Sequence, residues 1–150
     1  MPHDLYDWIR RIKSVEREHA SMRLATDRLL DEFRRDSTIL RGNLKLRDIV
    51  NASGFLEGTY IIRLFAEFET GLRLFRPTAR GTDPPSRTRD LIDGIAATRR
   101  IPDDERATAH DVREYRNFLV HERDEQVDPI SISEAGRYLC RFFKFLPPTW

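Results

Sequence analysis

The first 36 residues constrain the fold most strongly. From Asp4 to about Asp36 the chain has no glycine or proline, and apolar side chains recur every three or four residues with charged side chains between them. The positions on this stripe are Leu5, Ile9, Ile12, Val15, His19, Met22, Leu29 and Phe33. This pattern predicts one long amphipathic helix. Its length approaches the coiled-coil range, so we expect it to pack on another helix or on another subunit.

The middle of the chain contains the widest apolar pattern. Residues 37–43 break the first helix, with Gly42 and Asn43 as the turn, and residues 44–52 are expected to form a short helix. A stronger helix is predicted from Gly54 to Arg76 and Pro77. Its inward positions are Ile61, Leu64, Phe65, Phe68, Leu72 and Phe75. We therefore expect this helix to be the centre of the core.

Three further segments complete the predicted elements. Residues 79–87 are expected to form a loop, and Thr88 is expected to cap the next helix. Pro102 and the three acidic residues after it indicate the start of another helix, predicted to run to about Arg123. A capping box from Ser131 to Glu134 predicts the last helix, which ends before two prolines.

The expected fold is therefore an all-α, up-and-down bundle of five to six helices with a long N-terminal helix. Its 150 residues fit one domain, 1–150, and suffice for a real core. A hydrophobic fraction of 39% with a charged fraction of 34% fits helices that bury one stripe and expose a charged face.

Composition narrows the function classes. No uncharged stretch is long enough to span a membrane, and the N-terminus lacks a signal-peptide pattern, so the expected location is the cytoplasm. The net charge of +1 does not by itself predict binding to nucleic acid. Cys140 is the single cysteine, which excludes an intramolecular disulfide, and its apolar neighbours favour a small buried side chain.

No metal or cofactor is predicted. The chain has no Glu-x-x-His pair of the kind found in di-iron bundles, and its histidines and cysteine lack zinc-ligand spacing. Its glycines form no phosphate-binding loop. His110, followed by Asp111, is expected to be solvated.

The most informative motif is Arg-Asn-Phe-Leu-Val-His at positions 116–121. On the predicted helix, Glu114, Asn117 and His121 share one polar stripe, while Arg116 lies to the other side of it. Charged, amide and imidazole side chains on one exposed stretch are candidates for binding or catalysis.

This motif resembles the signature of HEPN domains, in which an Arg is followed after four to six residues by a His. Asn117 fits the polar residue that often follows the Arg, and the segment Ala-Glu-Phe-Glu-Thr-Gly-Leu at 66–72 resembles the acidic core-helix segment of many such domains. The late position of the motif, before one closing helix, fits as well.

The resemblance implies a metal-independent endoribonuclease, such as a toxin or a defence effector. A ribose 2′-hydroxyl would attack the adjacent phosphate, with His121 as general base or acid. Arg116 would hold the phosphate and its developing charge, and Asn117 would orient the imidazole or donate to a phosphate oxygen. The basic side chains expected to help bind RNA are Arg76, Arg80, Arg87, Arg89 and Arg113.

The spacing of the motif also bears on assembly. Five residues turn a regular helix by about 140° and advance it by about 7.5 Å, so Arg116 and His121 of one chain do not converge easily on one phosphate. The resemblance implies a homodimer in which two motifs face each other. An antitoxin or regulatory protein is a further expected partner. However, Arg123 stands where a subgroup silenced by a nucleotidyltransferase has Tyr, which argues against that particular partner.

Two other interpretations remain open. In the first, Arg116 pairs with Glu67 or Glu69, and the chain is a non-catalytic HEPN-like module that binds RNA, a nucleotide or a partner protein. In the second, the chain is a plain helical bundle in which the Arg-His spacing is accidental.

Overall fold

In the computed structural model the described residues form five α-helices and one short 3-10 helix. The structure describes residues 3–80, 83–121 and 126–150, with the backbone alone for 77–80. The helices are α1 (Leu5–Arg35), α2 (Leu46–Arg80), α3 (Thr88–Arg99), α4 (Asp103–Val120) and α5 (Ile132–Phe143), and the 3-10 helix η1 covers Ser37–Ile39. The predicted all-α bundle with a long first helix is confirmed.

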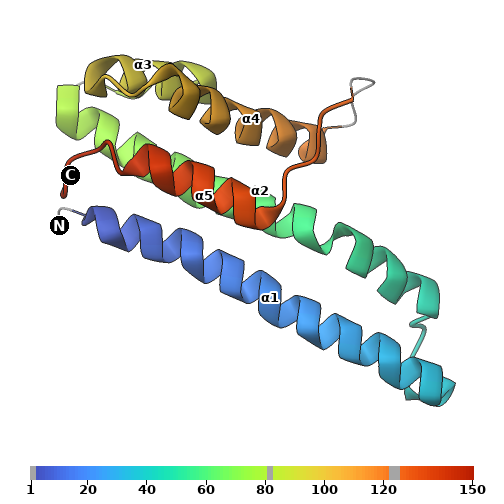
Figure 1. Ribbon diagram of the computed structural model, residues 1–150. Coiled ribbons are helices and arrows are strands. Elements are labelled where there is room, and N and C mark those ends of the chain that lie inside the picture. The colour runs from blue at the N-terminus through green and yellow to red at the C-terminus, as the bar shows by residue number, and fades with distance from the viewer. Residues whose placement is uncertain (1–2, 81–82, 122–125) are drawn as a thin grey trace.

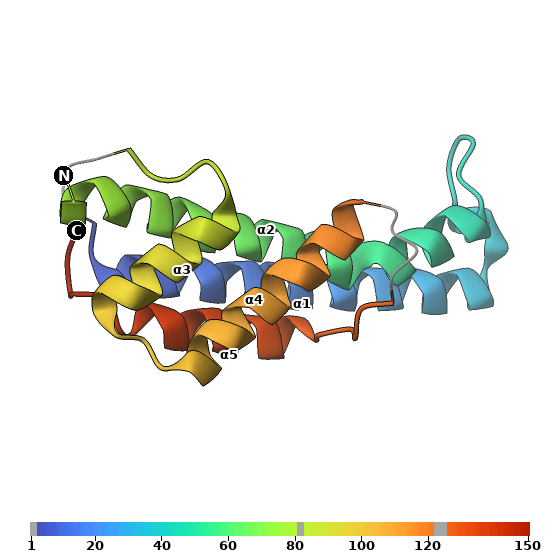
Figure 2. The same ribbon diagram turned by 90° about the horizontal axis from the view of Figure 1, so that it is seen from above.

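Helix α1 forms because its ends are capped and its stripe is apolar. Asp4 accepts a hydrogen bond from the Tyr6 backbone N–H at 2.9 Å, and two arginines occupy the last turn, where cations offset the helix dipole. Helix α2 runs back along α1, and α4 and α5 continue the alternation of direction (Figure 1). Helix α3 departs from it by running in the same direction as α2 (Figure 2).

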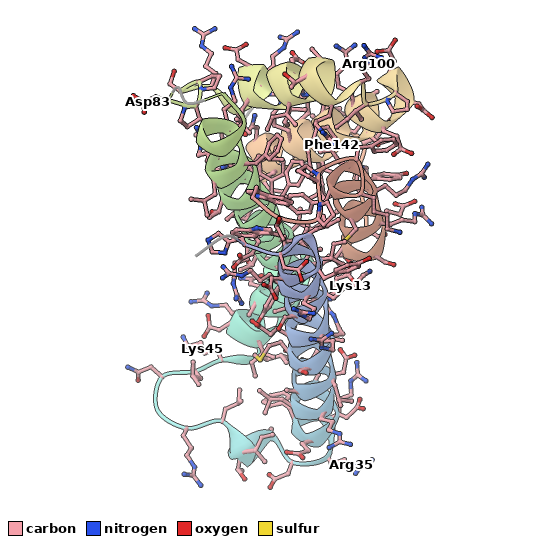
Figure 3. The ribbon with its side chains drawn as sticks, turned by 90° about the vertical axis from the view of Figure 1, so that its left-hand side faces the viewer. Lys13, Arg35, Lys45, Asp83, Arg100 and Phe142 are labelled. Atoms are coloured by element: carbon pink, nitrogen blue, oxygen red, sulfur yellow. The ribbon has the colours of Figure 1, made fainter. Side chains whose placement is uncertain are left out.

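One hydrophobic core joins all five helices at the broad end of the molecule. Phe68 of α2 packs edge-on against Phe142 of α5, with ring centroids 5.5 Å apart, and lies 5.1 Å from the Phe143 ring. Figure 3 shows Phe142 inside this broad end. The predicted core positions of α2, from Ile61 to Phe75, are all buried. The central role expected for this helix is therefore confirmed.

Residues 20–57 form a two-helix arm that extends beyond the core (Figures 1 and 3). The arm contains the second half of α1, η1 and the start of α2. Met22 lies on the predicted apolar stripe, yet it is 44% exposed, because α3, α4 and α5 do not reach this part of α1. The sequence pattern marks the apolar stripe of a helix but not how far its neighbours extend.

Helix α2 corrects two predicted boundaries. The short helix at 44–52 and the helix from Gly54 form one continuous helix, which also passes Pro77 and ends at Arg80. Glycine lowers helix stability by only about 1 kcal/mol, which the packing of α2 offsets. A proline near a helix end removes only one hydrogen bond of the last turns.

The starts and ends of the later helices differ in detail. Thr88 is the first residue of α3 and not its cap, because Arg87 holds the N-cap position. The Thr88 hydroxyl donates to Glu69. Helix α4 ends at Val120 and not near Arg123. The acidic residues after His121 in the sequence are unfavourable at the negative end of a helix. The capping box at the start of α5 is present as predicted.

Gly71 allows the closest approach in the core. A Cβ added there would lie 2.9 Å from Cζ of Phe143 and 3.0 Å from Cδ2 of Trp8, while a Cβ on Gly54 would meet nothing within 4 Å. Gly54 and Gly71, two of the three glycines of α2, therefore differ in the space around them.

We expect Gly71→Ala to lower the free energy of unfolding by about 1–3 kcal/mol through overpacking. Gly54→Ala, the matched control, is expected to raise it by up to about 1 kcal/mol through helix propensity. Urea unfolding followed by circular dichroism measures both, and equal stability of the two variants would contradict the packing assigned to Gly71.

Candidate functional site

The candidate site is built at the C-terminal end of α4, where that helix packs on α2. The side chain of Leu119 lies against Gly58, where an added Cβ would be 3.1 Å from Leu119 Cδ2. Tyr115 is stacked on Phe118, with ring centroids 6.4 Å apart. Burial raises the pKa of Tyr115, and the negative charge of Glu57 adds to this effect. These contacts fix the last two turns of α4 on α2.

Arg116 is held by three contacts, two with side chains of α2 and one with its neighbour Asn117 on α4. Its Cζ lies 5.3 Å from the centre of the Phe65 ring, Nη1 donates to Asn117 Oδ1 at 2.8 Å, and Nη2 lies 3.6 Å from Glu69 Oε2. Its Nε is buried without a hydrogen-bond partner among the described residues. The side chain remains 28% exposed, so the guanidinium is oriented and still reachable from solvent.

Glu69 connects this arginine to two other parts of the fold. Its Oε1 accepts from Arg73 Nη2 at 2.7 Å, from Arg73 Nε at 3.0 Å and from the Thr88 hydroxyl at 2.8 Å. Arg73 in turn donates to the carbonyl oxygens of Pro85 and Ser86. Glu67, the other carboxylate expected near Arg116, instead lies 3.6 Å from Arg11 of α1.

Asn117 contacts both ends of the motif. Its side-chain oxygen accepts from Arg116, and its backbone oxygen accepts from the His121 N–H at 3.0 Å. His121 is the C-cap of α4, with an extended backbone and an exposed side chain. Because the helix ends at Val120, the imidazole is not held on the helical stripe predicted for it. Among the described residues, no direct contact joins Arg116 to His121.

The predicted RNA-binding arginines do not form one surface. Arg76 has Nε and Nη1 buried without hydrogen-bond partners in the described part of the chain, and Nη1 lies against Gly94 of α3. Arg87 is exposed beside the start of α3, whereas Arg89 and Arg113 line a groove between α3 and α4. The side chain of Arg80 and all of Arg123 lie outside the described residues.

His110 is the residue that sequence reasoning missed. It was predicted to be solvated, yet its side chain is only 20% exposed, because Nε2 lies 2.7 Å from Asp93 Oδ1 and Arg113 Nε donates to Nδ1 at 3.2 Å. The signal in the sequence was its spacing: Arg106, His110, Arg113 and Asn117 recur every three or four residues along one face of α4.

Other chemistry is limited in the described residues. Within residues 3–80, 83–121 and 126–150, no three His, Cys, Asp or Glu side chains gather as a metal site would need. None of the helices in these ranges is both long and apolar enough to cross a membrane. Cys140 is buried, and its burial raises the thiol pKa, which disfavours a reactive thiolate.

Comparison of the chain with protein-family models, curated proteins and solved structures finds no match.

We expect Glu69→Ala to lower the free energy of unfolding by about 1–3 kcal/mol, because it leaves the partly buried donors of Arg73, Thr88 and Arg116 without their acceptor. Glu67→Ala removes a more exposed carboxylate from the same helix and should cost about 0–1 kcal/mol. Both substitutions have the same intrinsic helix propensity change, so urea unfolding isolates the contacts. A Glu67→Ala variant as unstable as Glu69→Ala would contradict this assignment.

Proposed function

We propose that the chain is a HEPN-like, metal-independent endoribonuclease whose site contains Arg116, Asn117 and His121. The observation that carries the proposal is the bond from Arg116 Nη1 to Asn117 Oδ1, which orients the guanidinium in the last turns of α4. A phosphate-binding cation and the exposed imidazole of His121 thus lie at one accessible helix end.

The proposed reaction is an intramolecular transesterification of RNA. His121 removes the proton from a ribose 2′-hydroxyl, O2′ forms a bond to the adjacent phosphorus, and the bond from phosphorus to O5′ breaks. The general acid is the protonated imidazole of the partner copy, which gives its proton to O5′. Arg116 stabilises the charge that grows on the phosphate oxygens. The products are a 2′,3′-cyclic phosphate and a 5′-hydroxyl, and no metal or cofactor takes part.

Two observations support action as a homodimer. Arg116 is held against Phe65 of α2, whereas His121 is the C-cap beyond the last residue of α4, and no direct contact joins the two side chains among the described residues. Apolar side chains are also exposed near this end of α4: Val120 is 47% exposed, and Phe55, about one turn before Gly58 on α2, is 74% exposed. A second copy that covers them would remove apolar surface from water and bring a second motif to the site.

The alternative is a non-catalytic HEPN-like module that binds RNA, a nucleotide or a partner protein. The ion pair between Arg116 and Glu69 favours this alternative, because a phosphate must compete with a carboxylate already near the guanidinium. The competition is weak, since Glu69 Oε2 is 3.6 Å away while Oε1 has shorter contacts to other groups. The role that fits the catalytic proposal is that of a cytoplasmic toxin or defence effector whose activity is inhibited by an antitoxin or another regulatory protein.

The catalytic proposal predicts cleavage of single-stranded RNA in the presence of a chelator. Arg116→Ala and His121→Ala should each lower the rate by at least about 100-fold, because each removes a group that acts in the transition state. Arg34→Ala, which removes an exposed arginine at the far end of α1, should not change the rate. Gel analysis with end-group mapping measures the products, and circular dichroism checks folding.

DNA of the same sequence should remain intact, because it lacks the attacking hydroxyl. Cleavage of that DNA, or full activity of the Arg116→Ala, His121→Ala double variant, would overturn the proposal. Salt-sensitive RNA binding without turnover would identify the non-catalytic module instead.

The proposed dimer makes a separate prediction. When wild-type chains are refolded with a large excess of His121→Ala chains, the activity per wild-type chain should fall, because most wild-type chains then have an inactive partner. Sedimentation should show a two-chain species. A monomer whose specific activity is unchanged by the excess would show that one chain suffices.

A further inference from the structure

We infer that the groove between α3 and α4 binds the unpaired RNA strand that flanks the proposed cleavage site. The inference rests on the proposed function and names the part of the substrate that this surface would hold. The groove is lined mainly by Arg89, Asp93, Arg106, His110, Arg113 and Glu114. Figure 2 shows α3 and α4 following each other across the upper face of the molecule.

The groove leads along α4 to the candidate site. Arg106, His110 and Arg113 are spaced by four and three residues, and Asn117 follows four residues later, so all four lie on one helical face. The eleven residue-to-residue steps from Arg106 to Asn117 span about 16 Å of helix, which accommodates more than one phosphate. A strand bound along this face would reach Arg116 and His121 at its end.

A chain of hydrogen bonds runs from Arg113 through His110 to Asp93 in the groove, and the donor and acceptor of each bond can be assigned. Arg113 always donates, so His110 Nδ1 is the acceptor at 3.2 Å. The ring proton is then on Nε2, which donates to Asp93 Oδ1 at 2.7 Å. Glu114 also pairs with Arg113. These contacts fix the Arg113 guanidinium with a side-chain exposure of only 13%.

The arginines at the rim are held much less firmly. Arg106 lies 3.3 Å from Asp103 and 3.8 Å from Asp93, and its side chain is 42% exposed. Arg89 is exposed on the α3 side. The exposed ion pairs of Arg106 contribute little, so a phosphate can replace a carboxylate beside its guanidinium at small cost.

The mixture of charges favours single-stranded RNA over a duplex. Three carboxylates, Asp93, Asp111 and Glu114, lie among the guanidinium groups. A duplex presents mainly its phosphates to such a surface, and the carboxylates would repel them. An unpaired nucleotide also presents base N–H donors, which carboxylates accept, while its phosphate binds an arginine.

The test is binding of a short fluorescein-labelled single-stranded RNA to the full chain with His121→Ala, in which cleavage is blocked. Arg89→Gln and Arg106→Gln in that background should each weaken binding about fourfold at physiological ionic strength. Each should also lower the salt dependence by about 0.7 in the log–log slope, the value for one lost contact to a single strand. The matched controls are Arg10→Gln and Arg34→Gln, which remove exposed arginines of α1 outside the groove and should bind as the parent does.

The outcomes separate this inference from the proposed function. Groove variants that bind as tightly as the controls would overturn the inference, even if the wild-type chain cleaves RNA. Groove-dependent binding without cleavage by the wild-type chain would uphold the inference and overturn the catalytic proposal. Equal competition by duplex RNA of the same length would overturn the assignment of an unpaired strand.

Discussion

The carboxylate of Glu69 is the interaction on which the arrangement around the candidate site depends. One oxygen accepts from Arg73 of its own helix and from Thr88 at the start of α3, and the other lies near Arg116 of α4. Arg73 also binds two carbonyl oxygens of the preceding loop. Three helices and one loop therefore share a single, largely buried acceptor. A largely buried carboxylate is favourable only when its lone pairs are satisfied, and the short bond from Thr88 to Glu69 therefore ties the start of α3 to α2.

Much of the fold was predictable because it depends on local patterns. The stripe of α1, the wide apolar face of α2 and the capping box of α5 each predict their element from neighbouring residues alone. The errors arise where tertiary contacts decide. Thr88 does not cap α3 because the helix starts at Thr88 itself, with Arg87 at the N-cap, and its hydroxyl donates to Glu69, 19 residues earlier in the chain. Helix α2 passes Gly54 because its packing offsets the lower helix propensity of one glycine.

The candidate site was predictable only as a set of residue types. The Arg-Asn-x-x-x-His spacing indicated the end of α4 as the site. It did not show that the Asn117 side chain accepts a hydrogen bond from Arg116. The spacing within α4 places His110 on one face with Arg106 and Arg113, but it does not show that the partner of His110 is Asp93 on another helix. Arg76 shows the opposite limit, since a basic residue near a loop packs two of its nitrogens against α3 instead of facing solvent.

The arm of residues 20–57 has a consequence for how the molecule opens. Among its described residues, Ile49 is the only apolar side chain that is buried, while Leu24, Val50 and Phe55 are more than half exposed. Its two helices are joined by side-chain bonds such as those from Arg23 to Ser53, at 2.8 and 3.0 Å. With so little buried surface to lose, the arm separates at a lower free energy than the core, and its amide hydrogens exchange through local opening. The arm and the core are therefore two cooperative units. The arm opens and closes while the core keeps the contacts of Glu69 intact.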